Sequence, residues 1–244
     1  MPGENEKDTF WEFKKCLASY DVDLLGTMLK KQGVVRLSGF LPADLKQDVT
    51  GEVDRLLEFH GRRVNVSVKS TGNTPRKYVS VSRTAVFEHA SLISKLYSCL
   101  ELNGFLERLT EGKVVECPYE SEQVVVNHMS HVGDTHGWHW DDYSYSLVLV
   151  LEVPKQQSGG RVEYVNGTAW DKSSDLVQCY LETMELQSLE LESGSAYLLL
   201  GKSVMHRVSP LLLPDTRKII CFTYATEEER FALIDHGSME NIYG

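Results

Sequence analysis

The spacing of hydrophobic residues changes about halfway along the chain. Over residues 1–115 most apolar side chains recur three or four positions apart, which places them on one face of a helix. The helices that this spacing predicts begin at Asp8 or Thr9, cover 21–31, run from Pro42 to Gly61, and cover 87–109 with a break near Asn103 and Gly104. A short apolar strand is expected at 34–37. We therefore predict a helix-rich layer over 1–115.

The second half of the chain contains short apolar runs separated by Gly, Pro, Asp and Ser. Such runs, with few helical patterns between them, are typical of antiparallel strands and not of alternating strand–helix units. The predicted strands cover 123–127, 145–153, 161–165, 196–200 and 218–224, and the best helix candidate covers 174–183. We predict an α+β fold in one domain, 1–244. An antiparallel barrel or double-sheet jelly roll over about 116–230 carries the helical layer, and a tail over 231–244 follows.

Charge narrows the class of partner. The 244 residues include 25 Lys and Arg against 35 Asp and Glu, a formal net charge of −10. An acidic chain is poorly suited to a phosphate backbone or an anionic membrane surface, because both are bound mainly by Lys and Arg. We therefore expect a small-molecule partner, and neither nucleic acid nor a membrane.

A cytoplasmic location is expected. Residues 1–8 are polar and acidic, unlike the basic and then apolar start of a signal peptide. The longest apolar runs are far shorter than the roughly 20 residues needed to span a bilayer. The five cysteines are scattered, odd in number and without a close pair, as a reducing compartment tolerates.

Histidines and acidic residues in the second half suggest a metal centre. His139 and Asp141 are two residues apart, so at the start of a strand both side chains would point to one face, away from Trp140. His206 follows the run 196–200 and can supply a third ligand. Two imidazoles and one carboxylate on one face of a metal form the facial triad of non-haem Fe(II) oxygenases. We therefore predict His139, Asp141 and His206 as catalytic metal ligands.

Arg217 strengthens this interpretation. It lies at the start of an apolar run, where a hairpin after His206 would return it to the metal. A guanidinium group binds a carboxylate through two parallel hydrogen bonds, and the distal carboxylate of 2-oxoglutarate is such a group. Arg217 is therefore the expected anchor of that co-substrate.

Other assignments of these residues remain open. The triad residues can be structural, with Asp141 and Asp142 in a solvated turn. A zinc hydrolase using His136, His139 and His206 would also suit imidazole ligands, but it leaves Arg217 unexplained. For His128 and His131 we expect packing roles.

With these residues identified, the sequence resembles the Fe(II)/2-oxoglutarate-dependent oxygenase superfamily. A narrower similarity is to bacterial enzymes that act on free amino acids, the lysine radical halogenases and the lysine hydroxylases related to them. It is carried by the stretch His-Gly-Trp-His-Trp-Asp-Asp, from His136 to Asp142, and by the separation of His139 from His206. The resemblance implies a double-stranded β-helix core, cupin-like in form, with Fe(II), 2-oxoglutarate as co-substrate, and O2.

Asp141 sets the reaction that the resemblance implies. The halogenases of this group carry a small residue at this position, and chloride takes the vacated place on the iron. Here a carboxylate is present, so the resemblance implies a hydroxylase. The resemblance further implies that 2-oxoglutarate is decarboxylated to succinate and CO2, that a ferryl intermediate abstracts a hydrogen, and that hydroxyl rebound follows. The expected substrate is free L-lysine, hydroxylated at C4, with ornithine or another cationic amino acid as the close alternative.

The resemblance also implies substrate contacts. Arg76, His136 and Asp142 match positions that hold the amino and carboxylate groups of the amino acid, Thr223 lines the same pocket, and Glu122 matches an acidic residue that faces the side-chain ammonium group. Tyr243 is the nearest candidate for a C-terminal aromatic lid. Ile219 stands where the superfamily places a serine two residues after the arginine, so the second anchor of 2-oxoglutarate is unidentified.

Alternatives to these contacts and to the function stay open. Arg76 can instead be a surface charge beside Lys77, and Glu122 a strand-edge residue. The alternative functions are an oxygenase acting on another amino acid or a peptide side chain, and a non-catalytic jelly-roll metal-binding module.

Overall fold

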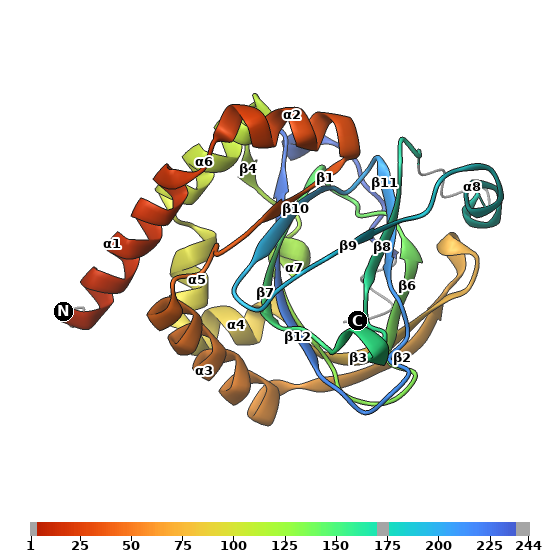
Figure 1. Ribbon diagram of the computed structural model, residues 1–244, viewed down its shortest axis with the longest axis horizontal. Coiled ribbons are helices and arrows are strands. Elements are labelled where there is room, and N and C mark those ends of the chain that lie inside the picture. The colour runs from red at the N-terminus through yellow and green to blue at the C-terminus, as the bar shows by residue number, and fades with distance from the viewer. Residues whose placement is uncertain (1–3, 170–175, 238–244) are drawn as a thin grey trace.

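One antiparallel sheet curls into a nearly closed barrel (Figure 1). The computed structural model describes residues 4–169 and 176–237. Over these residues the sheet has 12 strands in the order β1-β10-β7-β12-β5-β3-β6-β11-β8-β9, with β2 paired to β3 and β4 to β12. The strands are β1 (Val34–Leu37), β2 (Arg62–Val68), β3 (Thr74–Val81), β4 (Val115–Glu116), β5 (Val124–Met129), β6 (Thr135–His139), β7 (Tyr145–Glu152), β8 (Val162–Asn166), β9 (Gln187–Leu189), β10 (Ala196–Leu200), β11 (Val204–Val208) and β12 (Arg217–Ala225). This is the predicted double-stranded β-helix.

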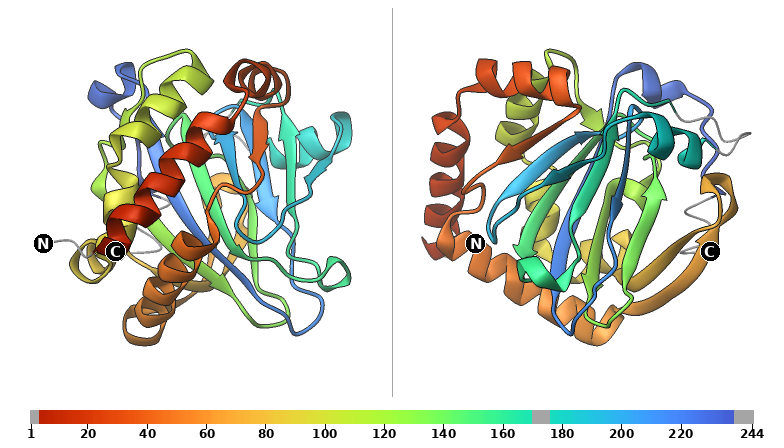
Figure 2. Two further views of the ribbon diagram at one scale, coloured as in Figure 1. Left: turned by 60° about the vertical axis from the view of Figure 1, so that its left-hand side comes forward. Right: turned by 45° about the vertical axis from the view of Figure 1, so that its right-hand side comes forward.

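Helices of the first half cover one wall of the barrel from outside, as Figure 2 shows. They are α1 (Glu4–Ser19), α2 (Val22–Gln32), α3 (Ala43–His60), α4 (Arg83–His89), α5 (Ser91–Tyr97) and α6 (Leu100–Thr110). The short α7 (Glu120–Gln123) precedes β5, and α8 (Val177–Thr183) packs on the opposite wall. Short 3-10 turns lie at Lys69–Thr71, Gln156–Ser158 and Glu228–Phe231. Among the described helices none is both long and apolar enough to cross a membrane.

The alternation of side chains along the strands separates two cores. Leu147, Leu149 and Leu151 of β7 pack under the helices with Ile220 and Phe222 of β12. The intervening residues Val148, Val150 and Ile219 face the barrel interior. Because successive side chains of a strand point to opposite faces, Arg217, Ile219, Cys221 and Thr223 all line one internal cavity.

The predicted helical layer contains a hairpin that the spacing did not indicate. Strands β2 and β3 pair from Arg62 with Ser80 to Val68 with Thr74. Val64, Val66 and Val68 alternate with polar residues, which suits a half-buried strand. The turn between the strands is closed by Gly72 and Asn73, both in the left-handed region at φ 72° and 61°. The first half is mostly helical as predicted, but the prediction missed this hairpin.

The helices over 83–110 break at positions other than those predicted. Breaks lie at Ala90 and at Ser98–Cys99, while α6 runs unbroken through Asn103 and Gly104. The first break is stabilised from outside, because the Glu52 carboxylate of α3 accepts the backbone N–H groups of Leu92 and Ile93 at 3.1 and 3.0 Å. That contact caps α5 and cannot be seen in local spacing.

Other elements also differ from the sequence-based prediction. Helix α1 already includes Glu4, ahead of the predicted start, and Pro42 caps α3 instead of opening it. Strands β6 and β11 were not predicted as runs. Both are short and interrupted by polar residues. The described part of the helix predicted over 174–183 begins at Val177, and residues 170–175 lie outside the described residues.

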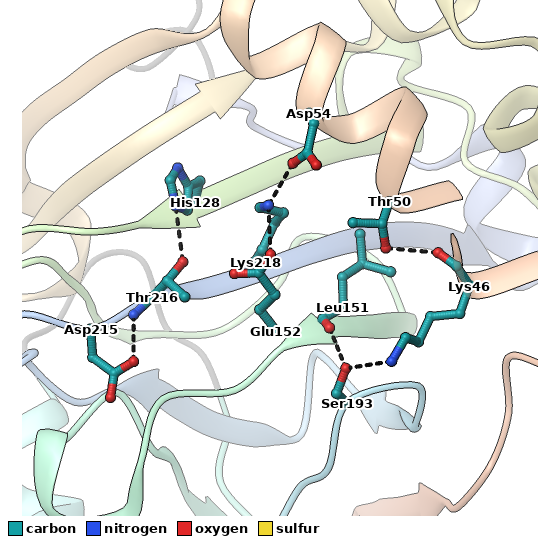
Figure 3. A network of polar contacts seen from close by, with 10 residues as sticks. All are labelled: Lys46, Thr50, Asp54, His128, Leu151, Glu152, Ser193, Asp215, Thr216 and Lys218. Carbon is teal, nitrogen blue, oxygen red and sulfur yellow. Dashed lines mark hydrogen bonds and ion pairs between the residues drawn. The ribbon is translucent and has the colours of Figure 1, made fainter. Parts of the chain in front are cut away.

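A buried lysine joins the helical layer to the barrel (Figure 3). The Lys218 Nζ donates to Asp54 of α3 at 2.6 Å and to Glu152 of β7 at 2.7 Å. Burial opposes the charge of Lys218, but the two carboxylates outweigh it and raise its pKa above the ordinary value. Lys218 is the neighbour of Arg217 on β12, and the two side chains point to opposite faces of the strand.

Lys218→Met is expected to lower the free energy of unfolding by about 1–2 kcal/mol, because two carboxylates lose their shared partner while the aliphatic stem is kept. Urea unfolding at constant m-value measures this. Lys14→Met, which removes an exposed ion pair to Glu101, is the control and should cost less than about 0.5 kcal/mol. Equal effects of the two substitutions would contradict the anchoring role.

Candidate active site

His139, Asp141 and His206 converge inside the barrel. His139 ends β6 and is paired directly with His206 of β11. The Asp141 Oδ1 lies 3.6 Å from the Nε2 of each histidine. The three ligand atoms all lie within 4.8 Å of one another. A metal ion held at about 2.0–2.2 Å from each ligand atom requires such a spacing.

The local structure differs in one respect from the predicted arrangement. His139 closes a strand and does not open one, and Asp141 lies beyond the strand end. The convergence therefore depends on the path of the loop after β6 as well as on strand alternation. The Asp141 N–H donates to the Gly201 carbonyl at 3.1 Å, which holds this loop against the turn between β10 and β11.

Both imidazoles are oriented for metal binding. The His139 Nδ1 lies 2.8 Å from the Gly137 carbonyl oxygen, and the His206 Nδ1 lies 3.0 Å from that of Val204. A carbonyl only accepts, so each Nδ1 carries a proton, and each Nε2 is the nitrogen that faces the Asp141 carboxylate. Desolvation and then the neighbouring His206 lower the pKa of His139 well below its ordinary value. His139 is therefore neutral, as a ligand must be.

Arg217 enters the same cavity, but not by the predicted hairpin. Strand β12 pairs with β4, β5 and β7, whereas β11 pairs with β6 and β8. Arg217 thus reaches the cavity from a different wall because the barrel closes. It is 4% exposed, and its buried Nη2 has no hydrogen-bond partner among the described residues. A buried cation with an open donor is suited to a carboxylate ligand.

Tyr197 of β10 is a site residue that the sequence analysis missed. It lines the cavity and its hydroxyl is in hydrogen-bond contact with Arg217. Burial raises the pKa of Tyr197 to about 12, so the hydroxyl keeps its proton. Tyr197 is therefore a neutral donor beside the guanidinium group. It is a candidate for the second anchor of 2-oxoglutarate, which the sequence analysis did not identify.

The five residues predicted to contact the substrate all line this cavity: Arg76, Glu122, His136, Asp142 and Thr223. Arg76 is 3% exposed, so the surface alternative is wrong. Its pKa is lowered to about 10 by burial, which leaves it charged at neutral pH. Glu122 lies in α7 and is buried, so the strand-edge alternative is wrong as well.

His136 is an internal imidazole and not one of the converging ligands. Its ring stacks on that of His139, with centroids 4.1 Å apart and planes at 4°. Desolvation and then Arg76 lower the pKa of His136 well below its ordinary value. The groups of potential ligand atoms in the described residues place His139 with Asp141 and His206, and do not include His136. This arrangement disfavours the alternative set of three histidines.

A second cluster joins Glu122 and Asp142 of the cavity wall to His236, a residue that the sequence analysis missed. The His236 Nδ1 lies 3.1 Å from Glu122 Oε1 and 3.6 Å from Asp142 Oδ2. The Tyr119 ring stacks on His236 with centroids 3.8 Å apart. His236 is far from the other three residues in sequence, and no local pattern connects it to them. Tyr243, the predicted lid residue, lies outside the described residues.

The remaining histidines named above lie away from the centre. The His128 Nε2 contacts the Thr216 hydroxyl at 3.1 Å, as Figure 3 shows. The His131 side chain is 72% exposed, close to Asp134. Neither residue lines the cavity that contains the triad.

Comparison with known proteins identifies the family of the chain. A model of the family described as halogenase D matches residues 18–244. The chain belongs to the halogenase D family. No curated protein sequence matches it.

Solved structures show where the fold of this halogenase D family member recurs. The epimerase SnoN, a non-haem α-ketoglutarate-dependent enzyme of nogalamycin biosynthesis, is similar with a TM-score of 0.68 and 13% identity over 84% of this chain and 80% of SnoN. A prolyl hydroxylase from Trichoplax adhaerens is similar with a TM-score of 0.65 and 15% identity, over 90% of this chain and 94% of the hydroxylase chain. An oxidoreductase of the 2OG-Fe(II) oxygenase family from Burkholderia pseudomallei is similar with a TM-score of 0.62 and 14% identity, over 88% of this chain and 96% of the oxidoreductase chain.

The fold is thus that of Fe(II)/2-oxoglutarate oxygenases, and the residues present fit Fe(II), 2-oxoglutarate and O2. Two imidazoles and one carboxylate occupy one face of a metal position, which leaves three positions for exchangeable ligands. The unpartnered Arg217 Nη2 offers a donor to the co-substrate carboxylate.

Proposed function

We propose that this protein is an Fe(II)/2-oxoglutarate-dependent hydroxylase of a free cationic amino acid, with L-lysine as the preferred substrate and C4 as the preferred carbon. The observation that carries the proposal is the Asp141 carboxylate, whose Oδ1 lies 3.6 Å from both histidine Nε2 atoms. A carboxylate in this position takes the place on the metal that a halide would need. The protein is thus a member of the halogenase D family whose proposed metal ligands, two histidines and one aspartate, favour hydroxylation.

In this proposal His139, Asp141 and His206 hold Fe(II), and Arg217 binds the distal carboxylate of 2-oxoglutarate with Tyr197 as second donor. The iron, when bound, supplies the activation of O2 by which a C–H bond of the substrate is oxidised. The protein residues orient the two organic molecules and exclude water. Orientation decides which carbon is attacked, since errors of about 1 Å cost reactivity.

The charges in the cavity wall support a zwitterionic substrate that carries an additional cation. Arg76 is buried and charged, so it can bind a carboxylate. Glu122 and Asp142 are 8% and 7% exposed and lie together at the cavity wall. His236 lies against both carboxylates, and a cationic group of the substrate suits the same place because buried carboxylates are stabilised by positive charge. We assign the ammonium group of the side chain to Glu122, and the head group to Arg76, His136 and Asp142, with Thr223 beside them.

The lining of the cavity favours a small substrate. The triad, Arg217 and the five predicted contact residues all line the same cavity, and a concave site with a few converging polar groups is typical of small-molecule binding. A peptide side chain or another amino acid is the alternative substrate, and a non-catalytic metal-binding module is the alternative function. Each alternative is an outcome of the experiment below.

The test has two stages. Anaerobic addition of Fe(II) and then 2-oxoglutarate should produce a visible metal-to-ligand charge-transfer band. Under air, with chloride present, the free proteinogenic amino acids and ornithine are then screened by mass. A gain of one oxygen on lysine with stoichiometric succinate is expected. Chlorinated product would contradict the hydroxylase assignment, and a colourless protein that makes no succinate would contradict oxygenase function.

Glu122→Gln is expected to raise the KM for the cationic amino acid by about 10–100-fold, because a hydrogen bond to a charged group contributes about 1.5–3 kcal/mol. The KM for 2-oxoglutarate should change less than about twofold. Steady-state kinetics with each substrate varied in turn measure both constants. Glu120→Gln, on the same short helix but 73% exposed, is the matched control. Equal changes in both KM values would mean that Glu122 is structural.

A further inference from the structure

Gly201 has no side chain at a position where one would collide with Asp141. A Cβ atom at residue 201 would lie 2.6 Å from the Asp141 Cβ, 2.8 Å from its Oδ2 and 2.7 Å from the Tyr143 carbonyl oxygen. Non-bonded atoms do not approach this closely, so any side chain at 201 forces a shift. Two of the three obstructing atoms are a backbone oxygen and a Cβ, which have little freedom to move.

Two backbone hydrogen bonds tie Gly201 to the segment that carries Asp141. The Asp141 N–H donates to the Gly201 oxygen at 3.1 Å, and the Gly201 N–H donates to the Ser144 oxygen at 3.0 Å. These two bonds join the turn between β10 and β11 to the loop between β6 and β7. A shift at residue 201 is therefore transmitted to Asp141.

Ser146 holds the Asp141 carboxylate from another direction. Its hydroxyl, on β7, donates to the Asp141 Oδ2 at 2.6 Å, and Ser146 is 2% exposed. Oδ2 is therefore engaged by the protein, while Oδ1 is the oxygen turned toward His139 and His206. The two oxygens of one carboxylate thus have different partners.

We propose that Gly201 and Ser146 are positioning residues that hold Asp141 as a one-oxygen metal ligand. Gly201 provides the space and Ser146 fixes the rotation of the carboxylate. This inference rests on the proposed function, since it takes Asp141 as a ligand of the metal. Its consequence is that Asp141 occupies one coordination position. A carboxylate bound through both oxygens would take one of the three positions that the co-substrate and dioxygen need.

The test measures the affinity for Co(II), a redox-stable substitute for Fe(II), by calorimetry with no co-substrate present. Gly201→Ala and Ser146→Ala are each expected to weaken binding by about 10–100-fold, as loss of groups that orient a ligand does. In an Asp141→Ala background neither substitution should weaken binding further, because the carboxylate that they position is gone. Gly104→Ala is the matched control, since a Cβ there meets nothing within 4 Å.

Each outcome decides between the inference and the proposal beneath it. If Asp141→Ala leaves Co(II) binding unchanged, the ligand assignment fails and the inference with it. If Asp141→Ala weakens binding but Gly201→Ala and Ser146→Ala do not, the inference alone fails. Equal losses in both backgrounds would show that the two residues act on the fold. Ser146→Ala introduces no larger side chain. If Gly201→Ala does not fold, the Co(II) affinity of Ser146→Ala with and without the Asp141 carboxylate still tests the inference.

Discussion

Replacing Asp141 with alanine is expected to reduce 2-oxoglutarate-dependent hydroxylation by more than about 100-fold, since loss of an outer-shell partner alone costs about 10–100-fold. The substitution removes the single carboxylate ligand of the triad and leaves two imidazoles. Succinate formation and product mass measure the activity. The anaerobic charge-transfer band should weaken in parallel at a given Fe(II) concentration. We do not expect Asp141→Ala to gain halogenase activity, because chloride also needs a supporting shell.

Asp142→Asn is the control for this substitution because it alters the adjacent carboxylate. Asp142 lies near Glu122 and His236, away from the converging histidine Nε2 atoms. It should keep the charge-transfer band while losing affinity for the amino acid. Retention of full activity by Asp141→Ala would place the metal elsewhere and overturn the proposed triad.

Replacing Arg217 with methionine is expected to raise the KM for 2-oxoglutarate by about 30-fold to several thousand-fold. Truncating one partner of a buried, hydrogen-bonded charge pair costs about 2–5 kcal/mol, which corresponds to that range. Arg217 is 4% exposed, so little water can replace its donors. The dependence of succinate formation on 2-oxoglutarate concentration measures the effect, and the Kd for Co(II) should be unchanged.

Lys218→Met provides the comparison for Arg217→Met. It removes the neighbouring cation of the same strand, whose partners Asp54 and Glu152 lie on the opposite face. It should lower stability and leave the KM for 2-oxoglutarate of the folded protein unchanged. A similar rise in KM for both variants would show that the effect comes from disturbing β12 and not from the guanidinium group.

Much of the barrel could be predicted because its long strands have a clear local pattern. The predicted run 196–200 coincides with β10, and those at 145–153 and 218–224 differ from β7 and β12 by one residue at one or both ends. In contrast, β6 and β11 were not predicted as strands, although they carry the two histidine ligands. The histidines of these strands line the cavity, and polar residues at such positions weaken the hydrophobic alternation on which strand prediction depends.

The candidate site shows the same division. The residue types of His139, Asp141, His206 and Arg217 suggested a metal and an anion-binding group, and the structure brings all four to one cavity. His236 could not be found in this way, because it lies 114 residues from Glu122 in the chain and their contact follows no local spacing. The role inferred for Gly201 depends on what its missing Cβ would strike, which only coordinates reveal.

The sequence by itself determined the chemical groups of the site and the strands with a strong apolar alternation, because side-chain type and local spacing are properties of neighbouring residues. Only the tertiary structure decided that Arg217 reaches the cavity from a different wall, that Tyr197 stands beside it, and that Ser146 and Gly201 surround Asp141. These relations arise when the barrel closes and places residues that are distant in the chain within hydrogen-bonding distance. Local spacing contains no information about such contacts.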